Sequence, residues 1–108
     1  MFEESNEPSH EEMVKIVRSE EVKKSLENYL KREDKSALTE KGIIKKYTIK
    51  DDTIKVTPLN SIIFDIYLNS DEELECNINI SKNNNVYEVQ GVSLSSKASE
   101  YIKGEYNG

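Results

Sequence analysis

The sequence predicts an α+β domain, in which a long N-terminal helix packs on an antiparallel meander sheet of about four strands and a short helix ends the fold. Three observations support this class. The N-terminal third has apolar residues at helical spacing and lacks Gly and Pro from residue 9 to residue 32. The middle of the chain alternates apolar with polar residues, which is typical of half-buried strands. Strands that follow one another after a helix favour an α+β arrangement.

Size and charge limit the function classes. The 108 residues make one domain with a core of its own. The net charge of −6 comes mostly from residues 1–12, which carry five glutamates and no Lys or Arg and leave −1 for the rest. The rest has no obvious basic patch, so we do not expect nucleic-acid binding. No run of residues approaches the length and hydropathy of a membrane-spanning helix.

The long helix is expected from Ser9 to residue 31 or 32. Residues 1–8 are acidic and lack periodicity, so we interpret them as a disordered lead-in to a single domain at residues 9–104. Ser9 and Glu12 form a capping-box pattern at the helix start. Glutamates placed four residues before lysines support the helix further along.

The first two turns of this helix are apolar on nearly all sides. Met13, Val14 and Val17 lie away from the main apolar stripe when the helix is projected. One interpretation is that the helix start is buried between the sheet and a later segment. The other is that these three residues contact a partner or a second copy. Exposed apolar clusters on monomers are usually small, which favours the first interpretation.

Residues 36–41 predict a short helical turn that ends at Gly42 in a left-handed conformation. Ala37 and Leu38 in this turn are expected to close an edge of the core. Ile43–Lys50 is rich in β-formers and predicts the first strand. Asp51 and the residue after it indicate a turn or bulge, and the alternation resumes at residues 53–57. The sequence does not decide whether residues 43–57 form one bent strand or two short ones.

The hairpin Ser61–Ile80 is expected at the centre of the sheet, with a polar turn at Asn69–Glu73. Its apolar residues alternate along both strands and should form the core: Ile62, Phe64, Ile66 and Leu68, then Leu74, Cys76, Ile78 and Ile80. Ser81–Asn85 predicts a second turn, and Val86–Leu94 predicts a last strand with a bulge at Gly91. Ser95–Lys103 then predicts a short helix that Gly104 ends, before a frayed tail at residues 105–108.

No catalytic constellation stands out. His10 lies at the helix start without an evident partner, and Cys76 alternates with core residues, so a packing role is favoured over a nucleophilic one. The acidic turn at residues 69–73 lacks the spacing of an EF-hand. Asp65 and Glu75 fall on the polar sides of neighbouring strands, where paired carboxylates can act as acid and base. The mixture of polar residues around them is instead typical of a solvated sheet face.

That polar face is nevertheless the best candidate for recognition. Ile63 and Tyr67 lie on the side that should face water, although both are largely apolar. Tyrosine is enriched at protein interfaces. The candidate interaction face consists of Ile63, Asp65, Tyr67, Glu75 and Asn77. The alternative candidate surface is the partner-facing helix start, which consists of Met13, Val14 and Val17.

Two stretches resemble an uncharacterised family of Gram-positive bacteria, domain of unknown function 1310. The first is His10–Val17 (HEEMVKIV) and the second is Ala37–Lys45 (ALTEKGIIK), and the region of Pro58 is a third point of similarity. Members of this family are small and commonly begin with a hydrophobic export or anchor segment, so the resemblance implies an extracytoplasmic location. This sequence shows no such segment. The resemblance implies no catalytic residues, because none are established for the family.

We therefore expect a small, non-catalytic, extracytoplasmic binding module whose partner is a protein of the cell envelope. Membrane attachment is expected only through an N-terminal anchor, self-association is at most weak, and no cofactor or metal is expected. The alternative is a protease inhibitor or immunity-type protein, because cystatin-like folds also lay a helix on an antiparallel meander. A hydrolase that uses Asp65 and Glu75 is the least favoured alternative.

Overall fold

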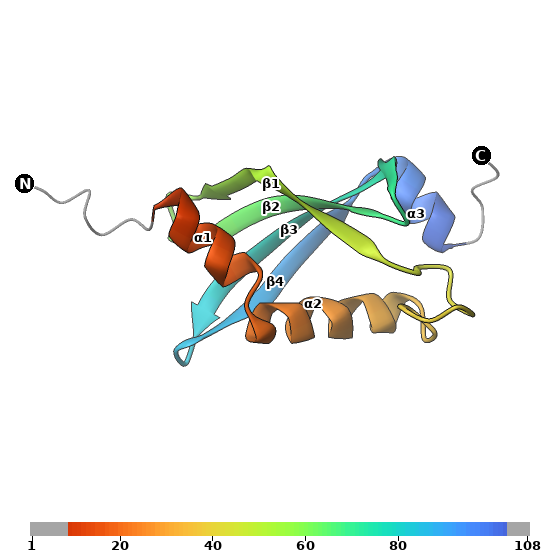
Figure 1. Cartoon of the computed structure of the whole chain (residues 1–108), viewed down its shortest axis with the longest axis horizontal. Helices are drawn as coiled ribbons and strands as arrows, with labels where there is room; N and C mark the ends of the chain where they lie inside the picture. The colour runs from red at the N-terminus through yellow and green to blue at the C-terminus, as the bar shows by residue number, and fades with distance from the viewer. Residues whose placement is uncertain (1–8, 104–108) are drawn as a thin grey trace, which may run out of the picture.

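The computed structural model describes residues 9–103, and it confirms the α+β class (Figure 1). Four strands form one antiparallel sheet in the order β1-β2-β3-β4, and three helices accompany it. The expected lead-in, the stop at Gly104 and the expected tail lie outside the described residues. The elements in chain order are α1 (His10–Val17), α2 (Glu20–Glu33), β1 (Tyr47–Val56), β2 (Ile62–Leu68), β3 (Asp71–Asn83), β4 (Val86–Leu94) and α3 (Ser96–Ile102).

The prediction of one long N-terminal helix is wrong, because the helix is interrupted between Val17 and Glu20 and forms α1 and α2. Ser19 is responsible: its hydroxyl donates to the carbonyl of Ile16 at 2.7 Å and accepts from the main-chain N–H of Val22 at 3.4 Å. Serine side chains compete with the helix for main-chain groups and are favoured as N-caps. Ser19 therefore ends α1 and caps α2. The capping box of Ser9 and Glu12 at the start of α1 is confirmed.

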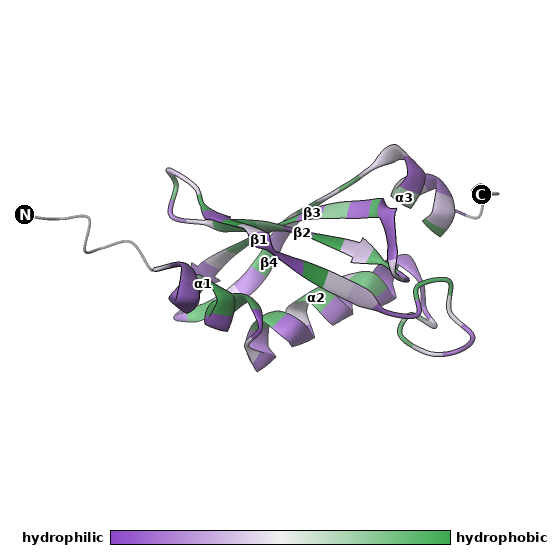
Figure 2. Cartoon of the chain, turned by 45° about the horizontal axis from the view of Figure 1, so that its top comes forward, coloured by the Kyte–Doolittle hydropathy of each residue, from purple (hydrophilic) through white to green (hydrophobic). Residues whose placement is uncertain are grey.

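The core lies between the helices and one face of the sheet. Alternate residues of β2 and β3 are buried as predicted, and Figure 2 shows apolar and polar segments alternating along the elements. Each fully buried aliphatic or aromatic side chain contributes about 1.5–3 kcal/mol relative to an exposed one. The helices contribute Met13, Val17, Val22, Leu26, Leu30 and Ala98 to this core.

The first strand is one bent strand. Its pairing with β2 is regular from Tyr47 to Lys50 and resumes at Lys55, so the predicted irregularity after Lys50 is a bulge. The hydroxyl of Thr53 spans this bulge by accepting from the N–H of Asp65 and donating to the carbonyl of Lys50. The strand begins at Tyr47 rather than Ile43. The main-chain N–H groups of Lys45 and Lys46 instead donate hydrogen bonds to the Oδ1 of Asn69.

The segment before β1 differs from the predicted helical turn. Residues 35–42 form successive turns without a helix, and the residue with positive φ is Leu38 (φ 68°), not Gly42. Glycine is needed at position 42 because a Cβ there would lie 2.2 Å from the carbonyl oxygen of Ser36. Ala37 is buried and Leu38 packs against the core, as expected.

The turns between β2 and β3 and between β3 and β4 are tight, and each contains two residues with positive φ. Asn69 and Ser70 have φ values of 54° and 62°, so the first turn is shorter than the predicted polar segment and β3 begins at Asp71. Two consecutive residues with positive φ match the twist of the flanking strands. The bulge at Gly91 is confirmed, because the register of β4 against β3 shifts there.

Candidate functional site

The predicted interaction residues do share one face of the sheet. In the register of β2 and β3, Asp65 lies opposite Asn77 and Tyr67 lies opposite Glu75. Ile63 lies on the same side, two residues before Asp65. The side chains that alternate with them point into the core below α1 and α2. We call Ile63, Asp65, Tyr67, Glu75 and Asn77 the open sheet face.

Polar groups on the open sheet face are already partnered. The Nδ2 of Asn77 donates to Asp65 Oδ1 at 2.9 Å, and Lys50 Nζ lies 3.7 Å from Glu75 Oε2. The ion pair is partly exposed and is therefore worth at most about 1 kcal/mol. Neither carboxyl group is buried, and neither lines one of the two grooves described below.

Asn79 continues the open sheet face, opposite Ile63. Its Oδ1 is buried and has no hydrogen-bond partner within the described part of the chain. An unpaired buried acceptor costs about 1–3 kcal/mol. Its next neighbour across the sheet is Gly91, which has open space where a side chain would stand. The face is therefore open on the side of Asn79 that adjoins Gly91.

The apolar start of the first helix is mostly buried within the chain. Met13 is 8% exposed and Val17 is 1% exposed, and both belong to the core. Val14 is half-buried and packs against them. This arrangement agrees with the interpretation in which the helix start is buried. It leaves Val14 as the one member of this set with appreciable exposure.

The sole cysteine is a packing residue. Burial raises the pKa of the Cys76 thiol to about 12, and the carboxylates of Glu75 and Asp65 contribute in the same direction. A thiol nucleophile instead needs a lowered pKa and some exposure. His10 is exposed in the first turn of α1. Within residues 9–103, no group of three or more His, Cys, Asp or Glu side chains is arranged to hold a metal ion.

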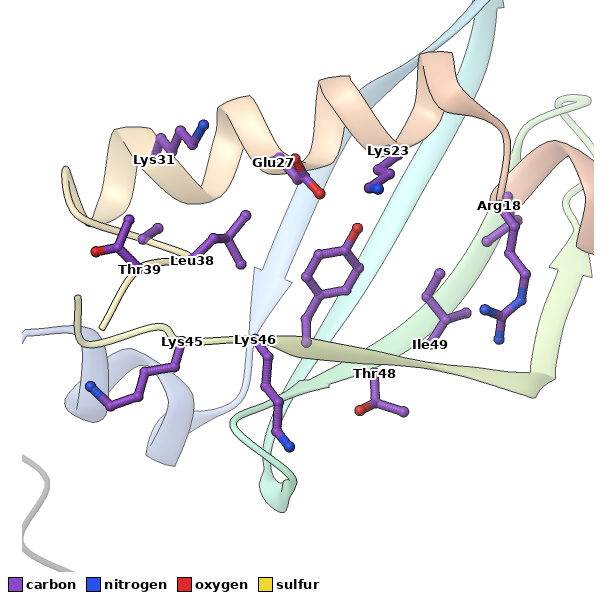
Figure 3. A pocket seen from close by; sticks show the side chains of 13 residues that line it. Arg18, Lys23, Glu27, Lys31, Leu38, Thr39, Lys45, Lys46, Thr48 and Ile49 are labelled. Carbon is purple, nitrogen blue, oxygen red and sulfur yellow. The ribbon is translucent and has the colours of Figure 1, made fainter. Parts of the chain in front are cut away.

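A groove that the sequence analysis did not predict lies between α2 and β1. Its volume is about 730 Å³, and Figure 3 shows Lys23, Glu27 and Lys31 along its helical wall. Tyr47, Ile49 and Leu38 supply its apolar lining. Burial, with a smaller contribution from the Glu27 carboxylate, raises the pKa of the Tyr47 hydroxyl, and Arg18 opposes the shift.

The groove is basic. Its lining includes five basic residues and one acidic residue, Glu27. Arg18 is paired with Asp51 at 2.8 Å, and the Nζ of Lys45 donates to two main-chain carbonyls. The remaining basic residues of the lining have no ion pair or hydrogen bond from their side chains to residues 9–103: Lys23, Lys31 and Lys46. The signal in the sequence was the lysine-rich strand IIKKYTIK, because lysines are common on edge strands.

A second, smaller groove of about 350 Å³ lies where α1 and α2 meet the β3–β4 hairpin. The ammonium group of Lys82 lies 5.5 Å from the centre of the Tyr87 ring beside it. Such cation–π contacts at exposed sites contribute about 0.5–1 kcal/mol. This contact stabilises the tip of the hairpin.

These features define a small two-layer α+β domain with a basic groove along an edge strand, and among residues 9–103 no helix covers the open sheet face. The chain belongs to the family described as protein of unknown function (DUF1310), whose model matches residues 1–101. This match confirms the resemblance found in the two short stretches. No curated protein and no solved structure matches the chain. Within residues 9–103, none of the helices has the length and apolar character needed to span a membrane.

Proposed function

We propose that this protein is a small, non-catalytic, extracytoplasmic module that binds a protein of the cell envelope through the open sheet face. The observation that carries this proposal is the placement of Ile63 and Tyr67 on one sheet face, on either side of Asp65 and among hydrogen-bonding groups. Tyrosine is enriched at protein interfaces, where apolar and polar contacts are combined. The export or anchor segments common in the family support the proposed extracytoplasmic location.

The backbone that carries the open sheet face is fixed by the strands and core residues around it. β2 is an inner strand, with β1 on one side and β3 on the other. Its alternate residues Phe64 and Ile66 are fully buried beneath the face. Side chains that are fixed before binding lose little conformational entropy when a partner docks. Asp65, held by Asn77, retains acceptor positions for donors of a partner.

A paired substitution tests this surface. Tyr67→Ala combined with Ile63→Ser removes both apolar side chains of the open sheet face and should abolish capture of the envelope partner by the full-length protein. The matched control is Leu59→Ser, which removes an 87% exposed apolar side chain in the turn before β2. The melting temperature of the paired variant should stay within a few degrees of the parent value, because both residues are only half-buried.

The partner itself is identified by a photo-crosslinking amino acid at position 67 in intact cells. One envelope protein should be cross-linked from position 67 and not from position 59. Equal capture by the paired variant and the parent would show that the partner docks elsewhere. Retention of a reporter fusion in the cytoplasm of the natural host would contradict the proposed location.

The second candidate is an inhibitor or immunity-type protein. The observation in its favour is the order of elements, in which helices precede four consecutive antiparallel strands, as in cystatin-like architecture. The analogy rests on architecture alone. It predicts nanomolar binding to a protease or toxin, and a panel of proteases that keep full activity in the presence of this protein would count against it.

A further inference from the structure

The two edges of the sheet differ in how their main-chain groups are used. At the outer edge of β4, the N–H of Tyr87 donates to Glu21 Oε2 and the N–H of Val89 donates to Ser25 Oγ, each at 3.0 Å. Both acceptors belong to α2. Side chains that occupy edge N–H groups prevent another strand from pairing there. The β4 edge is therefore closed.

The β1 edge is open. The N–H of Asn69 donates to the carbonyl of Lys46 at 2.9 Å, which fixes the phase of pairing between β1 and β2. Main-chain groups of an antiparallel strand point alternately toward and away from the neighbouring strand. Those of Tyr47 and Ile49 therefore point away from β2. Within the described part of the chain, no strand pairs with this side of β1.

The open edge runs along the basic groove. Lys23 and Lys31 lie on the helical wall, while Lys46 extends on the side of β1 away from α2 (Figure 3). An excess of positive charge, reduced on the helical wall by Glu27, thus flanks both faces that a strand added to β1 would present. The apolar side chains of Tyr47 and Ile49 lie on the core side, in the groove itself.

We propose that the groove binds an extended, acidic segment of another protein, which adds to the sheet as a strand beside β1. Main-chain hydrogen bonds to Tyr47 and Ile49 supply affinity that does not depend on sequence, and alternate side chains supply specificity. Acidic side chains on one face of the segment meet Lys23 and Lys31, and those on the other face meet Lys46. The segment is therefore selected by charge on both of its faces.

Charge also separates this partner from a second copy of the chain. In a symmetric pairing of two β1 strands, Lys46 and Lys50 of each copy would gather on one face, and of these two only Lys50 has an ion-pair partner within residues 9–103, Glu75. Like charges on facing strands are destabilising. The site uses other residues than the open sheet face, so the failure of one proposal leaves the other standing.

The test uses the full chain and a short fluorescent peptide of repeated Glu-Glu-Val-Val, which places glutamates on both faces of an extended strand. Binding is followed by fluorescence anisotropy, and amide hydrogen exchange of Tyr47 and Ile49 is followed by NMR. Lys23→Glu should weaken binding by about tenfold, because it replaces an attraction by a repulsion. The matched control is Lys24→Glu, an identical change at an exposed neighbour outside the groove lining, which should change binding by no more than about twofold.

Main-chain pairing is tested by the peptide itself. A version with alternate N-methylated amides keeps every charge but loses half of its donors, and it should not bind. Slower exchange of the Tyr47 and Ile49 amides on addition of the unmethylated peptide completes the expected result. Equal binding of the methylated peptide or of a DNA oligonucleotide would overturn the proposal in favour of a general anion site. Protection of those amides in a dimer without peptide would overturn it in favour of self-pairing.

Discussion

The hydroxyl oxygen of Ser25 in α2 accepts a hydrogen bond from the main-chain N–H of Val89 in β4, across 64 positions of the sequence. The contact is part-buried and closes one edge of the sheet. Together with the neighbouring contact from Glu21 to Tyr87, it explains why α2 lies along β4 and leaves β1 free.

Removal of this contact should weaken the fold. Ser25→Ala leaves the part-buried N–H of Val89 without an acceptor, which should lower the free energy of unfolding by about 1–2 kcal/mol. Urea unfolding measures the change, and hydrogen exchange at Val89 should accelerate. Ser93→Ala, on the exposed side of the same strand, is the control and should have a smaller effect. Equal unfolding free energies for Ser25→Ala and the parent would show that the contact contributes nothing.

Asn69 connects three segments and should tolerate few replacements. Its Oδ1 accepts from the N–H groups of Lys45 and Lys46, and its Nδ2 donates to the carbonyl of Ile43 and to the hydroxyl of Tyr101. Asn69→Gly keeps the positive φ but loses these bonds, and it should cost about 1–3 kcal/mol. Asn69→Ala adds a backbone cost of about 1 kcal/mol. If thermal unfolding showed Asn69→Ala to be more stable than Asn69→Gly, the added backbone cost assigned to alanine would be wrong.

The two glycines of the described segment should respond to alanine in opposite ways. Gly42→Ala places a Cβ 2.2 Å from the Ser36 carbonyl oxygen, so the turn must open, and we expect a loss of about 2 kcal/mol or more. Gly91→Ala meets nothing within 4 Å and should be neutral or stabilise by about 0.4–1 kcal/mol. Chemical unfolding of both variants beside the parent measures the contrast. A similar loss in both would show that strand geometry at Gly91, not space, governs its replacement.

The buried thiol should make stability fall at high pH. Because the pKa of Cys76 is about 12 in the fold against 9.0 for an exposed thiol, the unfolded chain releases this proton first as pH rises. The folded state then binds more protons, so the free energy of unfolding decreases with pH. Between pH 9 and pH 10 the loss should be about 1 kcal/mol. Urea unfolding at both pH values measures it.

The control for this prediction is Cys76→Ala, which should be less stable at neutral pH but should lose less stability over the same interval. The interval stops at pH 10 because burial also raises the pKa of the Tyr29 and Tyr47 hydroxyls above their usual 10.0, which adds losses of the same sign at higher pH. An identical pH slope in the parent and the variant would exclude the thiol as the cause.

The strands could be predicted because burial on one face imposes an alternation that is visible in the sequence. The same alternation placed Cys76 in the core and placed Ile63, Asp65 and Tyr67 together on the opposite face. The bulge at Gly91 was visible as a change of apolar phase along β4. All of these depend on residues close together in the chain.

The errors came from contacts between residues that are distant in sequence or from local competition for main-chain groups. Ser19 interrupts the helix through local bonds to Ile16 and Val22, and this competition for main-chain groups is not visible in the apolar spacing that predicted one helix. Leu38 adopts a positive φ that leucine rarely takes, and its N–H bonds to the carbonyl of Ile44 in return. The basic groove was not predicted, because it depends on α2 lying beside β4 rather than beside β1.

The order of the sheet also has a consequence for synthesis of the chain. Each strand pairs only with strands next to it in sequence, so β1, β2 and β3 can form a sheet before β4 has been synthesised. α2, in contrast, docks on β4, the last strand, and must wait until nearly the whole chain has left the ribosome. We therefore expect helix docking to be the late, slow step of folding, because it closes the longest loop. Until then the part of the apolar sheet face that α2 covers remains exposed, which makes a chaperone its first contact.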